Sequence, residues 1–186
     1  VNEVQEVSKG VECRIERKPL GVVASITPFN FPNMVPNWTL PNALVLGNTM
    51  VMKPSELVPL STVRMAELLE EAGLPNGVFN IVNGGKDVVE AICDHPKIEA
   101  VSFVGSTKVA KIVYQRATSN FKRCAALGGA KNHLIVLEDA HVDMAASNIA
   151  ASMSGCAGQR CMAASAMVAV GKVDHIIARL CEEAKK

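Results

Sequence analysis

The stretch GVVASI at residues 21–26 decides the fold of this 186-residue chain. It is short, apolar and rich in β-branched residues, which is typical of a strand buried in a parallel sheet. A turn rich in proline and asparagine follows at 27–33, and a helix is expected at 34–46 in spite of its prolines. A second apolar run at 49–52 then stops at Lys53. The order strand, helix, strand is the repeating unit of an α/β fold.

The same alternation continues along the chain to residue 127. Further buried strands are expected at 78–82, 100–104 and 123–127, with helices at 61–72, 87–93 and 107–117. A preceding strand at 11–17 alternates apolar and charged residues, as a half-exposed strand does. The prediction is therefore α/β: a Rossmann-like parallel sheet flanked by helices, with right-handed crossovers.

The pattern changes after the glycine pair at 128–129, which can act as a hinge. New strands are expected at 134–137 and 166–170, and new helices at 144–156 and 175–184. We therefore predict two domains, at residues 1–127 and 128–186, the second being the start of another α/β domain.

The composition is that of an ordinary globular protein, with 49% hydrophobic and 20% charged residues. A net charge of +1 and an aromatic content of 4% argue against a nucleic acid or membrane partner. The six cysteines are scattered and lack the spacing of a metal site, so we expect no metal. Such thiols indicate a reducing compartment, for which the bacterial cytoplasm and the mitochondrial matrix are both candidates.

One cysteine stands in a setting that suits a nucleophile. The sequence GQRC at 158–161 places Cys161 beside the cation Arg160, and a cysteine attacks as a thiolate, which positive charge stabilises. By chemistry alone, a role as a small buried hydrophobe is commoner for a cysteine, and this is what we expect of Cys156. For Arg160, a surface ion pair and the binding of a substrate carboxylate are both open.

Four other residues suit ligand binding, each with a plainer alternative. Asn30 could donate a hydrogen bond to a developing alkoxide, although asparagine is commoner in turns. Lys53 and Glu56 follow a strand, where open α/β sheets bind ligands, and they could grip ribose hydroxyls. Chemistry alone favours a solvated ion pair for these two. Ser106 begins a helix, which it would cap in either case, and it could also bind pyrophosphate.

Four motifs, taken in order, resemble the aldehyde dehydrogenase superfamily. They are PFNFP at 28–32, KPSE at 53–56, LGGAKNH at 127–133 and GQRC at 158–161. The chain looks most like the CoA-acylating branch, the methylmalonate-semialdehyde (malonate-semialdehyde) dehydrogenases, and the resemblance covers nearly all of it. Members of the superfamily are far longer, so the chain is expected to be an internal fragment.

The resemblance implies a role for each candidate residue. Cys161 would be the nucleophile, and Asn30 would stabilise the oxyanion together with the backbone N–H of Cys161. Domain 1–127 would bind NAD, and domain 128–186 would begin the catalytic domain. The expected NAD contacts are Lys53 and Glu56 at the adenosine ribose, Leu57 near the adenine, Ser106 at the pyrophosphate, and Thr27, Phe29 and Gly128 at the nicotinamide.

The chain departs from the hydrolytic members of the superfamily at one position. Those enzymes carry a water-activating glutamate where this chain has Leu127, or Ala126 if the motif is shifted by one residue. Neither side chain can act as a base, so the thioacyl enzyme would persist until an external thiol, coenzyme A, accepts the acyl group. The branch acts on semialdehydes that bear a carboxylate, which favours Arg160 as the residue that binds it.

The expected reaction is the NAD-dependent oxidation of malonate or methylmalonate semialdehyde, with decarboxylation and transfer to CoA. Two alternatives remain open: a hydrolytic aldehyde dehydrogenase whose base lies elsewhere, and a NAD-binding fragment without turnover. The resemblance also implies a homo-oligomer, a dimer or a tetramer, with the strand at 11–17 as an arm. The choice between the two semialdehydes stays open, because the full acyl pocket is not in the chain.

Overall fold

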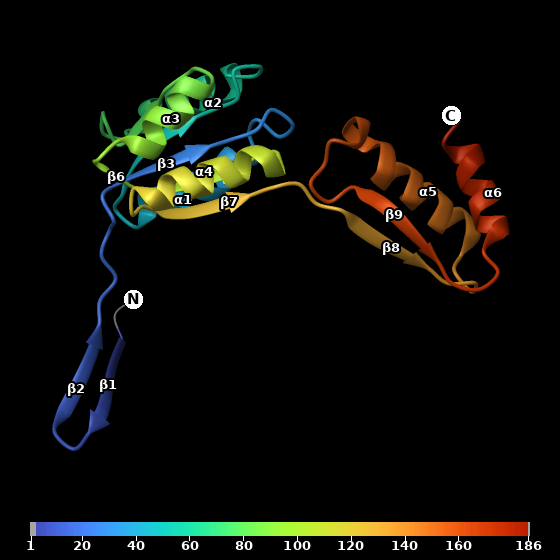
Figure 1. Ribbon diagram of the computed structural model, residues 1–186, viewed down its shortest axis with the longest axis horizontal. Helices are drawn as coiled ribbons and strands as arrows, with labels where there is room; N and C mark the ends of the chain where they lie inside the picture. The colour runs from blue at the N-terminus through green and yellow to red at the C-terminus, as the bar shows by residue number, and fades with distance from the viewer. Residues whose placement is uncertain (1–2, 186) are drawn as a thin grey trace. The chain divides into compact units, whose positions relative to one another are not determined.

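The computed structural model describes residues 3–185 and forms two compact units, Val1–Gly128 and Gly129–Lys186 (Figure 1). The first unit opens with an antiparallel hairpin of β1 (Glu3–Ser8) and β2 (Val11–Ile15). The sequence predicts only the second of these strands and extends it two residues too far. No helix in the described part of the chain is long and apolar enough to cross a membrane.

The centre of the first unit is a five-stranded parallel sheet in the order β5-β4-β3-β6-β7. Its strands are β3 (Val22–Ile26), β4 (Thr49–Lys53), β5 (Phe79–Ile81), β6 (Ile98–Val104) and β7 (Arg123–Leu127). The GVVASI stretch therefore forms the middle strand, paired with β4 on one side and β6 on the other. A strand with neighbours at both edges and helices on both faces meets little water, which accounts for its apolar residues. The predicted α/β fold is confirmed.

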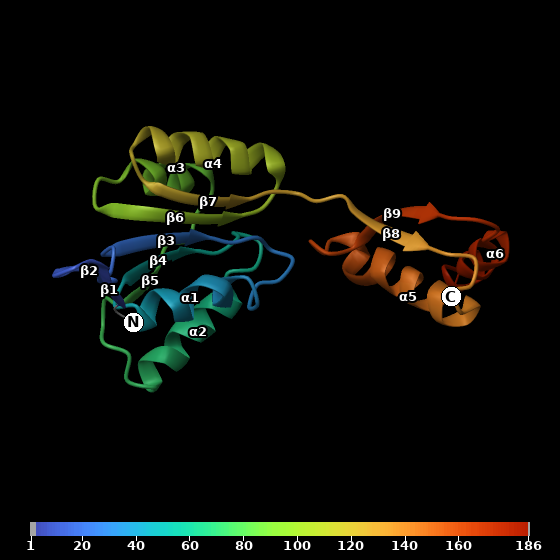
Figure 2. The same ribbon diagram turned by 90° about the horizontal axis from the view of Figure 1, so that it is seen from below.

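Four helices cover the two faces of this sheet. On one face lie α1 (Pro36–Val45) and α2 (Leu60–Glu71), and on the other α3 (Lys86–Asp94) and α4 (Thr107–Ser119) (Figure 2). Successive side chains of a strand point to opposite faces. Met50 and Met52 accordingly pack with α1 and α2, whereas Ala24 and Ile26 pack with α3 and α4. The unit thus has two apolar cores, one on each side of the sheet.

The helix α1 begins two residues later than the sequence predicts. A turn precedes it, and the helix opens at Pro36. Proline suits the first turn of a helix because the N–H that it lacks has no partner within the helix there. The side-chain amide of Asn37 donates to the backbone oxygen of Asn33 at 2.9 Å and stabilises the first turn of the helix.

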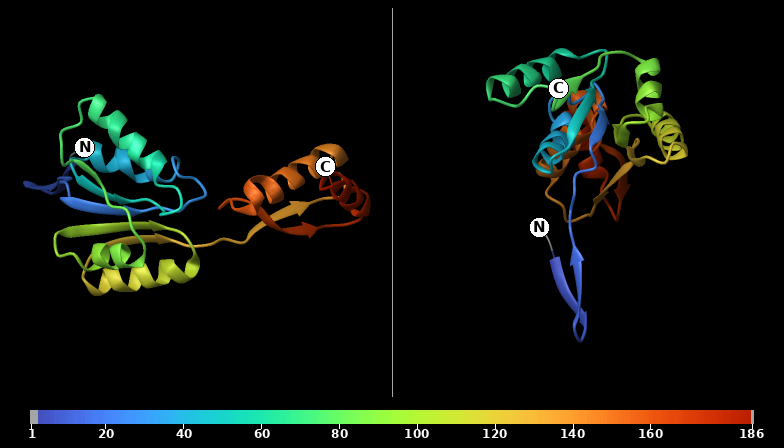
Figure 3. Two further views of the ribbon diagram at one scale, coloured as in Figure 1. Left: turned by 90° about the horizontal axis from the view of Figure 1, so that it is seen from above. Right: turned by 90° about the vertical axis from the view of Figure 1, so that its left-hand side faces the viewer.

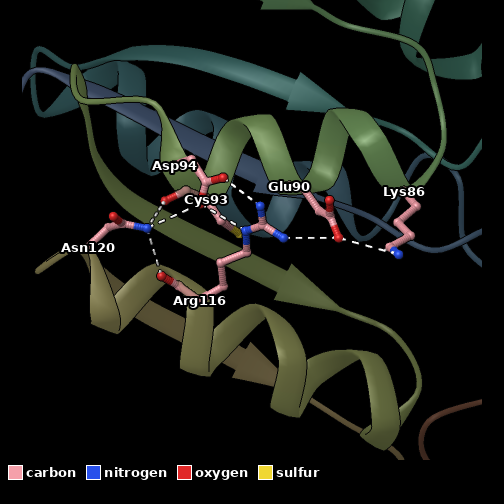
Figure 4. A network of polar contacts seen from close by, with 6 residues as sticks. All are labelled: Lys86, Glu90, Cys93, Asp94, Arg116 and Asn120. Atoms are coloured by element: carbon pink, nitrogen blue, oxygen red, sulfur yellow. Dashed lines mark hydrogen bonds and ion pairs between the residues drawn. The ribbon is translucent and has the colours of Figure 1, made fainter.

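A polar network joins α3 to α4 (Figure 4). The guanidinium of Arg116 donates to both carboxylate oxygens of Asp94, at 2.8 and 2.6 Å, and a third nitrogen lies 3.0 Å from Glu90. The amide of Asn120 donates to Asp94 at 3.2 Å and to the backbone oxygen of Cys93 at 3.3 Å. The bond from Arg116 lowers the pKa of the Asp94 carboxyl, so both partners stay charged at neutral pH. The network holds α4 against α3.

The second unit combines two parallel strands with two helices (Figure 3). These elements are β8 (Asn132–Val136), β9 (Ala164–Ala169), α5 (Val142–Ser154) and α6 (Asp174–Glu183). Their core consists of Val136 from β8, Ile149 from α5, Ile176 from α6 and Val173, which precedes α6.

The helix α5 ends earlier than the sequence predicts. It stops at Ser154, and a 3-10 turn, η1 (Gly155–Gly158), follows. Cys156 and Ala157 have φ of 55° and 52°, in the left-handed region, so the right-handed helix cannot continue through them. The small residues in this stretch predict a longer helix, because composition alone does not reveal that the backbone becomes left-handed at Cys156.

Candidate active site

The ligand residues predicted in the first unit follow the carboxyl ends of four neighbouring strands. In the register, Ile26 of β3 stands opposite both Lys53 of β4 and Phe103 of β6, and Phe103 stands opposite Ala126 of β7. The chain order reverses between β3 and β6, which is where open α/β sheets leave a crevice for ligands. The residues brought to this edge are Thr27, Phe29, Asn30, Lys53, Glu56, Leu57, Ser106 and Gly128.

Lys53 and Glu56 form a pair that is buried at one end and exposed at the other. Lys53 is the last residue of β4 and only 4% exposed. Its Nζ lies 3.0 Å from Oε2 of Glu56, whose side chain is 60% exposed. The interpretation as a fully solvated pair is therefore wrong for Lys53.

The charge of this pair is set by local hydrogen bonds. A hydrogen bond from the backbone N–H of Glu56 itself, and then the bond from Lys53, lower the pKa of the Glu56 carboxyl. The carboxylate is therefore ionised at neutral pH and can accept hydrogen bonds from neighbouring hydroxyls of a ligand. Leu57, the next residue, is 71% exposed.

The loop after β3 contains a buried hydroxyl that lacks a partner. The N–H of Thr27 donates to the backbone oxygen of Lys53 at 3.1 Å, which extends the β3–β4 pairing by one residue. Thr27 is 4% exposed, and its Oγ1 has no hydrogen-bond partner among residues 3–185. Such a group costs free energy, so a ligand that bonds to it gains that free energy. Phe29 is 42% exposed and Asn30 is half-buried.

Two glycines stand close to neighbouring residues beside the start of α4, Gly105 against the ring of Phe103 and Gly128 against Thr107. A Cβ on Gly105 would lie 2.6 Å from Cζ of Phe103, and a Cβ on Gly128 would lie 3.0 Å from Cα of Thr107. Ser106 precedes the helix in an extended conformation and is exposed, and its side chain makes no capping hydrogen bond. Ser106 is thus the N-cap residue of α4, as expected, but it caps the helix without a side-chain hydrogen bond. Its hydroxyl and the first amides of α4 can instead serve an anion.

These features fit a dinucleotide. An ionised carboxylate suits ribose hydroxyls, and a helix N-terminus suits pyrophosphate. The chain lacks a G-x-G-x-x-G fingerprint. Glycines are nevertheless present at this edge: Gly105 directly follows β6, and Gly128 directly follows the neighbouring strand β7.

The candidate nucleophile belongs to the second unit and lies between η1 and β9. Cys161 is exposed. The side-chain amide of Asn132 donates to the backbone oxygens of Cys161 at 2.7 Å and of Ala163 at 3.1 Å, so it anchors the segment that carries the thiol. The sequence does not reveal this role of Asn132. Its partners lie 29 and 31 residues away, a separation that leaves no local pattern to find.

Further candidate residues lie in η1 and in the short segment between η1 and Cys161. Cys156 is exposed, so the expectation that it packs in the core is wrong. Left-handed φ at Cys156 and Ala157 costs about 1–2 kcal/mol for each non-glycine residue, and strain of this kind is often found at functional sites. Arg160 is also exposed, and its guanidinium folds back onto Gly155.

The predicted catalytic residues are divided between the two units. Asn30 belongs to the first, and Cys161 and Arg160 belong to the second. Among residues 3–185 there is no group of three or more His, Cys, Asp or Glu side chains that could hold a metal ion.

Comparisons with known proteins agree with these motifs. The profile of the aldehyde dehydrogenase family matches residues 2–186. Malonate-semialdehyde dehydrogenase 2 of Bacillus thuringiensis (strain Al Hakam) is 51% identical over 185 residues, which are 99% of this chain and 38% of that protein. The enzyme of the same name from Geobacillus thermodenitrificans (strain NG80-2) is 54% identical over 179 residues, covering 96% of this chain and 37% of its own length.

Solved structures give the same result. The methylmalonate-semialdehyde dehydrogenase of Oceanimonas doudoroffii superposes with a TM-score of 0.94 at 49% identity, covering 98% of this chain and 38% of that one. A Sinorhizobium meliloti 1021 protein assigned to the same activity, and solved with NAD, has a TM-score of 0.95 at 46% identity over 100% of this chain and 38% of its own. The chain thus spans less than half the length of these relatives. With the family profile matched over almost its whole length, the chain belongs to the aldehyde dehydrogenase family.

Proposed function

We propose that the protein is an NAD-dependent, CoA-acylating semialdehyde dehydrogenase that acts on malonate or methylmalonate semialdehyde. The observation that carries this proposal is Leu127, the last residue of β7, which stands where hydrolytic relatives are expected to carry a catalytic glutamate. The names and the roughly half-identical sequences of the Bacillus and Geobacillus relatives support the choice of substrate.

NAD would bind at the carboxyl edge of the sheet in the first unit. Glu56, held by Lys53, would accept hydrogen bonds from the adenosine ribose, with Leu57 beside the adenine. Ser106 and the first amides of α4 would bind the pyrophosphate. When bound, NAD supplies the acceptor for a hydride. Three residues would surround the nicotinamide end: Thr27, Phe29 and Gly128.

Cys161 would attack the aldehyde carbon as a thiolate and form a thiohemiacetal alkoxide. Asn30 and the backbone N–H of Cys161 would donate hydrogen bonds to that oxygen and stabilise its developing charge. Loss of a hydride from the same carbon then leaves a thioester on Cys161. The two hydrogen bonds from Asn132 hold the backbone oxygens of Cys161 and Ala163, the residues on either side of Met162. The Cys161 thiol therefore lies on an anchored segment.

The fate of the thioester depends on what can attack it. Leu127 and its neighbour Ala126 offer no base to activate water, so hydrolysis should be slow. The thiol of CoA would then take the acyl group. Decarboxylation, inferred from the resemblance, would leave acetyl-CoA from malonate semialdehyde or propionyl-CoA from methylmalonate semialdehyde.

Arg160 would bind the carboxylate of the substrate. A guanidinium offers a planar pair of N–H donors that matches a carboxylate, and Arg160 is exposed and adjacent to Cys161. We also propose that the protein acts as a homo-oligomer, a dimer or a tetramer.

The test is NADH formation from malonate semialdehyde, measured with and without CoA. The protein is expressed as encoded, with any sequence that flanks this chain retained, beside a Cys161→Ala variant as control. Sustained turnover only with CoA, and none in the variant, is the expected result. Equal turnover without CoA would show that water is activated by another residue, and the hydrolytic alternative would replace the proposal.

A further inference from the structure

Gly155 is not required by the backbone that it occupies. It follows the last residue of α5, where glycine is usual because the chain often turns left-handed there. Here, however, Gly155 has φ of −55° and ψ of 134°, an ordinary extended conformation that any residue adopts. The left-handed residues come later, at Cys156 and Ala157. The glycine therefore calls for another explanation.

The space beside Gly155 is filled by the side chain of Arg160. A Cβ on Gly155 would have three nearest heavy atoms, and all three belong to the Arg160 guanidinium. Cζ and Nη2 would lie 2.5 Å away and Nη1 2.7 Å away, which is closer than non-bonded carbon and nitrogen atoms approach each other. The guanidinium thus lies flat against the backbone at the position where a side chain would stand.

We infer that Gly155 is a positioning residue for Arg160 and so contributes to selectivity for a substrate that carries a carboxylate. The inference rests on the proposed function, in which Arg160 binds that carboxylate. Two physical effects favour this place for the guanidinium. The end of α5 carries partial negative charge that attracts a cation, and a planar group that lies on backbone keeps a defined orientation for a two-point hydrogen bond.

A methyl group at residue 155 should displace the Arg160 guanidinium first. The Gly155→Ala backbone is unstrained, and the three nearest heavy atoms are the far end of a flexible side chain, which can swing away. The KM for malonate semialdehyde should rise about tenfold, equivalent to weakening one charge-assisted contact, with kcat nearly unchanged. Activity with propionaldehyde, an uncharged aldehyde, should be unaffected.

The decisive control is a double-mutant cycle with Arg160→Ala. If Gly155 acts only through Arg160, then Gly155→Ala should change nothing in the Arg160→Ala background. Asn148→Ala is a matched control, because Asn148 lies at an exposed position of α5, the helix that precedes Gly155. Thermal unfolding of each variant, followed by circular dichroism, should show unchanged folding.

The outcomes separate this inference from the proposed function. A raised KM in Arg160→Ala without one in Gly155→Ala would overturn the inference and leave the role of Arg160 standing. Equal losses with both aldehydes in Gly155→Ala would also overturn it, since they would indicate a general structural role. An unchanged KM in Arg160→Ala would overturn the proposed role of Arg160 itself, and the inference with it.

Discussion

Replacing Asn132 should loosen the segment that carries Cys161. The amide of Asn132 donates two hydrogen bonds to that segment, at 2.7 Å to the Cys161 oxygen and 3.1 Å to the Ala163 oxygen. Asn132→Ala removes both, and Asn132→Asp removes the donor while it keeps the shape of the side chain. At about 1 kcal/mol for each bond, the cost is ~2 kcal/mol. Local opening of the segment should then be favoured about thirtyfold.

Hydrogen exchange followed by mass spectrometry measures this opening directly. The N–H groups of Ala163 and Ala164 are bonded to the Arg160 oxygen at 3.1 Å and to Oγ of Ser152 at 3.1 Å, so they should exchange about thirtyfold faster. Asn148→Ala, at an exposed position of α5, is the matched control and should leave exchange unchanged.

The chain also offers an internal control for the same experiment. Its one tryptophan, Trp38, lies in the first unit, and residues 129–186 contain no aromatic side chain of Phe, Tyr or Trp. Unfolding followed by Trp38 fluorescence should therefore be the same in the variants and the wild type. Unchanged exchange at Ala163 and Ala164 in both Asn132 variants would refute the reasoning, because it would mean that these hydrogen bonds do not hold the segment.

Two further predictions concern the first unit. Glu56→Gln should weaken NAD binding about tenfold in titration calorimetry, because it keeps the shape but removes the charge that accepts ribose hydrogen bonds and balances the buried Lys53. A Glu56→Gln affinity equal to that of the wild type would place the ribose elsewhere. Burial raises the pKa of the Cys93 thiol from 9.0 to about 11, so its contribution to stability is complete below pH 9 and is lost as the pH rises to about 11. The loss in the free energy of unfolding amounts to about 2–3 kcal/mol. Urea unfolding at pH 8 and pH 11 should therefore show a smaller loss of stability at the higher pH in Cys93→Ala than in the wild type. Equal losses in the two proteins would contradict the assignment to Cys93.

The sequence predicts the elements of this fold well where local patterns decide them. The apolar runs at 21–26 and 49–52 predict buried parallel strands, because only a strand covered on both faces needs side chains that are apolar at nearly every position. The helix boundaries are less accurate: α1 starts at Pro36 rather than 34, and α5 ends at Ser154 rather than 156. These ends depend on the φ of single residues, which hydrophobic spacing does not report.

The candidate site, like the fold, has features that local sequence predicts and features that it does not. Motifs with chemistry in their own residues, such as KPSE and GQRC, predict Glu56 and Cys161 as candidate site residues from the sequence. Three features appear only in the tertiary structure: Lys53 is buried, Asn132 anchors Cys161, and the Arg160 guanidinium packs against Gly155.

By itself, the sequence determined the order of strands and helices from β2 onward and the kinds of side chain that reach the carboxyl edge of the sheet, because both follow from local pattern and composition. Only the tertiary structure decided how deeply Lys53 is buried, which distant carbonyls Asn132 binds and where the Arg160 guanidinium lies. These are contacts between residues far apart in the chain or between a side chain and folded backbone. They exist only once packing has brought the partners together.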